Sequence, residues 1–118
     1  MEIKLNLKLV QGQMFYESEK IDGELNSIII DSDNKCEVII ESDLGYLIFH
    51  RREHEGVNYY AVRTRTTTPK EDLKDYPTFD KFKLNEKILI TLIGRKNSEI
   101  SLILRFDKKS ETDSIYIP

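Results

Sequence analysis

The chain has 118 residues, a length typical of a single domain that buries a core without a disulfide or metal scaffold. Its 18 lysines and arginines against 21 aspartates and glutamates give a formal net charge of −3, which excludes a strongly basic protein of the kind that binds nucleic acid or acidic lipid through its overall charge. Charged residues make up 33% and apolar residues 39%, so the composition is not that of a disordered chain. We expect one domain over residues 1–118, with a partly mobile C-terminal tail at 107–118.

The apolar residues favour β-structure. Isoleucine and leucine dominate, tyrosine and phenylalanine follow, and Ala61 is the only alanine. Strands prefer β-branched and aromatic residues, whereas helices draw on alanine, so a helical bundle is excluded. The single cysteine, Cys36, lies in an alternating run and is expected to be a buried structural thiol.

Alternation of polar and apolar residues predicts short strands in the first part of the chain. The apolar residues of 2–10 fall at every second position, which is typical of a half-buried strand. A weaker strand is expected at 14–19. Two more are expected at 25–30 and 35–41, separated by a polar turn at 31–34.

Residues 46–52 and 57–66 predict a hairpin around the loop His54-Glu55-Gly56, with Gly56 in the left-handed conformation. In this register His50 faces Tyr60. On the other face of the hairpin, Leu47 lies beside Arg63, Phe49 beside Ala61 and Arg51 beside Tyr59. A two-residue loop would shift the register and change these pairs.

Residues 67–80 are the longest irregular segment. Within it, Thr68, Pro69 and Glu71 have the order of a helix start, with the threonine as N-cap. We expect a short helix or a projecting arm at 68–76.

Two apolar runs at 88–93 and 99–106 predict a second hairpin, with a three-residue loop in which Asn97 is left-handed. The expected register places Ile88, Ile90 and Leu92 opposite Leu104, Leu102 and Ile100. The other face then carries Leu89, Ile93 and Ile103. Apolar residues on both faces indicate a central strand, a covering arm or a subunit contact.

Short strands separated by polar turns predict an all-β fold. We expect an antiparallel β-sandwich, jelly-roll-like, of about 8–9 short strands. A small OB-like β-barrel is the alternative, because both folds show the same alternation and turn spacing.

The sequence predicts no catalytic, cofactor-binding or metal-binding residue. His50 and His54 stand four residues apart, but such a pair binds metal when a helix brings both onto one face, and here a strand and a turn are expected. His50 is expected to be partly buried and hydrogen-bonded, and His54 to be a solvated loop residue. No nucleophile motif or phosphate-binding glycine loop is present, so we expect a protein that is not an enzyme.

One group of residues stands out as a candidate partner surface. Arg51, Arg52, Arg63 and Arg65 lie in the hairpin predicted at 46–66, interleaved with Phe49, Tyr59 and Tyr60. Arginine and aromatic side chains on a sheet can stack and neutralise single-stranded nucleic acid, but they are equally favoured in protein interfaces. Cross-strand pairing with acidic and aromatic neighbours is the purely structural interpretation.

In general character, compact, all-β and rich in Lys, Ile, Asn and Asp, the chain is similar to small phage virion proteins such as head-completion, decoration or tail components, although no defined motif carries the likeness. This favours a non-enzymatic assembly module that contacts identical or different protein subunits, with single-stranded nucleic acid as the second candidate partner. Because no signal peptide or membrane-length segment is evident, we expect the protein in the cytoplasm or in a virion assembled there. The predicted partner-binding residues are Phe49, Arg51, Tyr59, Arg63, Arg65, Leu89, Ile93, Ile103, Ile115, Tyr116 and Ile117.

Overall fold

A computed structural model describes residues 1–66 and 78–107 of the chain, with side chains described up to residue 64 and again from residue 80. All regular elements in this part are strands, and it contains no helix. The strands are β1 (Glu2–Lys8), β2 (Gln13–Glu17), β3 (Ile21–Ser42), β4 (Leu47–Ala61), β5 (Thr64–Thr66), β6 (Thr78–Asp80), β7 (Phe82–Glu86), β8 (Ile88–Gly94) and β9 (Glu99–Asp107).

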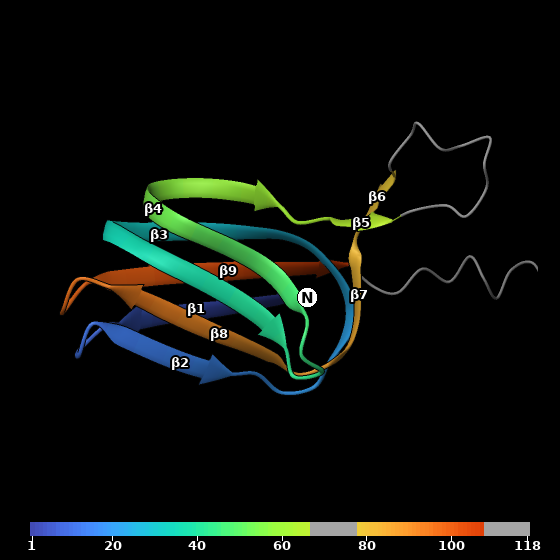
Figure 1. The fold of residues 1–118 in the computed structure, drawn as a ribbon, viewed down its shortest axis with the longest axis horizontal. Helices are drawn as coiled ribbons and strands as arrows, with labels where there is room; N and C mark the ends of the chain where they lie inside the picture. Colours follow the sequence, from blue (N-terminus) through green and yellow to red (C-terminus); the bar gives the residue numbers. More distant parts are fainter. Residues whose placement is uncertain (67–77, 108–118) are drawn as a thin grey trace, which may run out of the picture.

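Seven of the strands form one antiparallel sheet that is strongly curled into an open half-barrel (Figure 1). The order is β1-β9-β3-β8-β2, and β4 and β7 also pair with β3; β5 and β6 form a separate two-stranded ribbon. The all-β, antiparallel prediction is confirmed, with one sheet that folds over on itself in place of separate stacked sheets. The helix or arm predicted at 68–76 and the segment 115–117 lie outside the described residues.

The sheet is built mainly from four long runs of chain: β1 with β2, β3, β4, and β8 with β9. Each run folds back on itself at the same end of the molecule (Figure 1). β1 pairs with β9 and β2 with β8, while β3 pairs with β9 before its bend and with β8 after it. β4 follows β3 through the same bend (Figure 1). We call β1, β9, the first half of β3 and the second half of β4 the first wall. The second wall contains β2, β8, the second half of β3 and the first half of β4.

The bends use residues that accept an unusual backbone conformation. Gly12, Gly56 and Asn97 have φ angles of 82°, 80° and 66°, so the predicted left-handed conformations of Gly56 and Asn97 are confirmed. A side chain also links two bends, because Oδ1 of Asp33 accepts the backbone N–H of Glu99 at 3.1 Å. The bend end of the sheet is therefore held by specific bonds between neighbouring runs.

Two predicted turns are bends within continuous strands. The turn expected at 31–34 lies inside β3, where the register shifts between Ser32 and Cys36. The hairpin loop expected at 54–56 lies inside β4 in the same way, so the predicted register is wrong: Tyr60 pairs with Ile28, and His50 pairs with Ile39. The same polar residues and glycines occur both in turns between strands and in bends within a strand, so the sequence does not distinguish the two. Strand neighbours decide between the two, because continued pairing preserves ladder hydrogen bonds.

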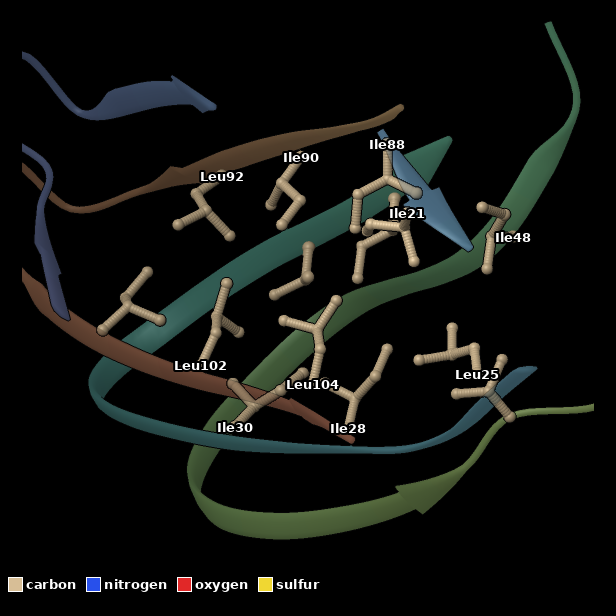
Figure 2. Packing of buried hydrophobic residues seen from close by; sticks show 14 of the residues in the cluster. Ile21, Leu25, Ile28, Ile30, Ile48, Ile88, Ile90, Leu92, Leu102 and Leu104 are labelled. Carbon is tan, nitrogen blue, oxygen red and sulfur yellow. The ribbon is translucent and has the colours of Figure 1, made fainter. Parts of the chain in front are cut away.

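The hairpin predicted between 88–93 and 99–106 is also wrong. β8 and β9 are not paired with each other, because the loop between them carries the chain from the second wall to the first. The choice of the buried face is nevertheless correct. Ile88 and Ile90 of β8 and Leu102 and Leu104 of β9 are fully buried and point into the space between the walls (Figure 2).

A single apolar core fills the fold of the half-barrel. Figure 2 shows Ile28 and Ile30 from the first wall and Ile90 and Leu92 from the second wall converging on the same space. Half-buried apolar residues of the outer strands, including those of β1 at every second position, pack against it. Burial of one face leaves the outer faces and the strand edges as the surfaces on which function can depend.

Candidate interaction surfaces

An aromatic and arginine cluster lies in the opening of the half-barrel along β4. The ring centroids of Phe49 and Tyr60 are 5.2 Å apart, and the guanidinium carbon of Arg51 lies 5.8 Å from the centroid of Tyr60. The bend of β4 brings its two halves together here. The structure thus places Phe49 and Arg51 beside Tyr60 and not beside Tyr59. Both halves of β4 pair with β3, where Tyr60 lies opposite the buried Ile28 and Tyr59 faces outward.

His54 lies next to this cluster and is only 1% exposed. The prediction that it is a solvated loop residue is therefore wrong. Its Nε2 lies 2.8 Å from the carbonyl oxygen of Gly56, which can only accept, so Nε2 carries a proton and donates it to this bond. Nδ1 is hydrogen-bonded to the hydroxyl of Tyr60 at 2.8 Å, and the Asn58 amide donates to the same hydroxyl oxygen at 3.4 Å. Sequence reasoning missed this network because it assigned 54–56 to a hairpin loop.

His50 and Cys36 have structural surroundings. Nε2 of His50 lies 2.6 Å from Oε2 of Glu37 on the outer face of the second wall. Cys36 is buried and unpaired, as predicted, and burial together with the charge of Asp33 raises the pKa of its thiol despite a hydrogen bond with Ser32. No group of three or more metal-binding side chains occurs among the residues that the structure describes.

Arg51 and Arg63 do not lie on one surface. Arg51 lies in the opening, whereas Nη1 of Arg63 donates to the backbone carbonyls of Asn26 and Val62 at 2.8 and 2.7 Å. Arg65 lies in β5, where its backbone pairs with Phe79. The predicted hairpin would have placed Arg51 and Arg63 together, and the bend of β4 separates them.

The outer face of the second wall combines apolar and acidic side chains. Phe15, Leu47 and Ile93 are exposed, and the half-buried Leu89 lies between Glu17 and Glu41 in the ladder. Sequence reasoning identified Leu89 and Ile93 and missed the two others; the alternation of 13–17 was the available signal for Phe15. The acidic residues of this face are Glu17, Glu37 and Glu41.

Ile103 lies on the outer face of the opposite, first wall. The ladder places it beside Ile29, which in turn lies beside Tyr59. The single face predicted for Leu89, Ile93 and Ile103 is therefore wrong, because β8 and β9 belong to different walls. Tyr59 is 58% exposed at the end of this apolar row.

Two polar contacts secure the end of the sheet opposite the bends. The ring of Tyr46 stacks on Phe82, with centroids 6.3 Å apart, and its hydroxyl donates to Glu86. Burial and that carboxylate raise the pKa of Tyr46 to about 12. Nearby, a hydrogen bond from Lys81 lowers the pKa of Asp107, the last residue of β9.

Neither a protein-family model nor a curated protein matches the chain. No helix among the described residues is long and apolar enough to cross a membrane.

Proposed function

We propose that the protein is a non-enzymatic assembly module that acts through contacts with protein subunits, of the kind found in phage virions as head-completion, decoration or tail components. The observation that carries this proposal is the pair of outer faces, where Tyr59 on one wall and Phe15 and Ile93 on the other expose apolar side chains. Tyrosine, phenylalanine and other large apolar residues are favoured at the centre of protein interfaces.

Strand edges add to this argument. β1, β2 and β4 each pair with one strand only within the described part of the chain. A free edge presents unpaired backbone N–H and C=O groups that can extend a sheet into a neighbouring subunit. Apolar faces that end in free edges suit a component of a larger assembly.

The same features support a jelly-roll-like sandwich over an OB-like barrel as the finer description of the fold. Two walls enclose one core, and strand pairing does not close the sheet between β1 and β2 in the described residues. A closed barrel requires hydrogen bonding around its whole circumference.

Single-stranded nucleic acid is the second candidate partner, and the geometry favours it less. Phe49, Arg51 and Tyr60 form one stacking cluster, but Arg63 is bonded to backbone carbonyls away from it. A nucleic-acid groove needs cations that follow the phosphate backbone over several nucleotides. The cluster contains one arginine beside two aromatic rings, which is too few cations to follow several nucleotides.

Sedimentation velocity of the full chain tests the proposal, over concentrations from about 1 to about 500 µM. We expect the weight-average mass to rise with concentration. In parallel, fluorescence anisotropy with a labelled single-stranded oligonucleotide at low salt measures the alternative. A monomer at every concentration contradicts the assembly proposal. Salt-sensitive oligonucleotide binding by that monomer, weakened by Arg51→Ala, would favour nucleic acid instead.

A further inference from the structure

Among the residues that the structure describes, the second half of β4, residues 57–61, is a free strand edge with a defined backbone polarity. The N–H of Val62 donates to the carbonyl of Asn26 on β3, so the even-numbered residues of this segment direct their backbone groups toward β3. The backbone groups of Val57, Tyr59 and Ala61 therefore point away from the sheet. In Figure 1 this half of β4 is the outermost strand of the first wall.

This edge lacks the charged residues that usually protect exposed edges. Its sequence is Val-Asn-Tyr-Tyr-Ala, and Val57 and Tyr59 are 68% and 58% exposed. The edge of β1 on the same wall differs, because Lys4 and Lys8 flank its free backbone groups. Within one wall, therefore, one edge is protected against pairing and the other is open to it.

The ends of the open edge carry opposite charges. Glu55 lies shortly before it and Arg63 shortly after it, and both are exposed. The guanidinium of Arg63 also donates to the carbonyls of Asn26 and Val62. In an antiparallel pair centred on Tyr59, Val57 faces Ala61 of a second copy, and Glu55 approaches Arg63 of that copy. Because the pair is two-fold symmetric, the favourable charge contact occurs twice.

The apolar row on the outer face continues across the same axis. Ile103, Ile29 and Tyr59 lie in line on one copy. The second copy would place its own Tyr59 directly opposite, which creates an aromatic cross-strand pair at the centre of the contact. Backbone pairing, charge and apolar surface thus indicate the same partner in the same register.

We propose that residues 57–61 of β4 pair antiparallel with the same segment of a second copy of this chain, joining two first walls into one continuous sheet. This rests on the proposed assembly function and specifies its partner and register. The three outward-facing residues allow up to about six backbone hydrogen bonds between copies. Because the edge is short, the interface lies below the roughly 1,200 Å² of stable complexes, and a micromolar dissociation constant is expected.

The first experiment compares two exposed aromatic residues on different edges by sedimentation velocity. Tyr59→Lys places two ammonium groups opposite each other on the axis, and it should raise the dissociation constant at least about tenfold. Phe15→Lys on β2 is the matched control, since Phe15 is similarly exposed, and it should leave association unchanged. Association that survives Tyr59→Lys, or that is lost only in Phe15→Lys, overturns the proposed edge while leaving the assembly function in place.

The second experiment uses charge reversal and mixing. Glu55→Arg and Arg63→Glu should each be monomeric, because every homodimer then opposes like charges. An equimolar mixture should dimerise again with approximately the wild-type dissociation constant, since both contacts are complementary in the heterodimer. Circular dichroism of each variant confirms that it is folded. If the separate variants associate as the wild type does, or if the mixture stays monomeric, the two-fold register is wrong. A monomeric wild type contradicts the assembly function itself.

Discussion

At the scale of single residues, His54 shows how a polar side chain becomes part of the core region. Both ring nitrogens have partners, one in the Gly56 carbonyl and one in the Tyr60 hydroxyl. A buried polar atom that loses its partner costs more free energy than the bond contributes when it is formed. The position of Tyr60, and with it the cluster of Phe49 and Arg51, therefore depends on a residue outside that cluster.

Tyr60→Phe tests this network. The change removes the hydroxyl that is hydrogen-bonded to Nδ1 of His54, and we expect the free energy of unfolding to fall by about 1–2 kcal/mol. Tyr59→Phe is the matched control, because its exposed hydroxyl can be lost with a change within about 0.5 kcal/mol. Urea denaturation of both variants at low protein concentration measures the difference. Equal stabilities would show that the bond to His54 contributes nothing.

Tyr46 provides a second test, at alkaline pH. Its folded pKa of about 12 is above the ordinary 10.0, so its contribution to stability is complete below pH 10 and is lost as the pH rises toward 12. Tyr46→Phe should remove this part of the alkaline loss, and Glu86→Gln should reduce it by removing the charged acceptor. Urea midpoints measured between pH 9 and about 12 give the slope. A wild-type slope in Tyr46→Phe would contradict the assigned pKa.

At the scale of elements, the shared bend is the feature that the sequence could not predict. Alternation correctly identifies the core-facing residues of β1, β8 and β9, because burial of one face requires period two whatever the strands pair with. The polar residues of 31–34 and 54–56 only indicate a change of direction. Whether the chain ends a strand there or bends within it depends on neighbours that are distant in sequence.

Packing at this bend makes Gly94 a critical position. A Cβ at Gly94 would lie 3.1 Å from Cδ1 of Leu9, 3.1 Å from the carbonyl oxygen of Lys35 and 3.2 Å from Cβ of Cys36. We expect Gly94→Ala to lower the free energy of unfolding by about 1–3 kcal/mol through overpacking.

A double-mutant cycle locates the origin of that loss. In a Leu9→Ala background the cost of Gly94→Ala should be smaller, because one of the close atoms is absent. Guanidinium denaturation of the four proteins supplies the coupling free energy. Strict additivity, or a Gly94→Ala protein as stable as the wild type, would mean that the bends are not packed together as described.

At the scale of the whole molecule, the sequence predicted the kinds of residue at the surface better than their arrangement. Tyr59 and Arg63 were singled out as parts of one hairpin face, but Tyr59 lies within the edge of β4 and Arg63 lies beyond its end. Ile103 belongs to the same wall as Tyr59. Exposed apolar residues can be anticipated from alternation. Their grouping depends on which wall each strand joins, and that is decided by long-range pairing.

Hydrogen exchange of individual backbone amides, followed by NMR at low and high protein concentration, tests the assembly account most directly. The amides of Val57, Tyr59 and Ala61 on the free edge should exchange rapidly in the dilute protein and slow markedly as concentration rises. The amide of Tyr60, already directed toward β3, and those of the β1 edge should change little. Exchange at Val57, Tyr59 and Ala61 that stays fast at every concentration would contradict the account.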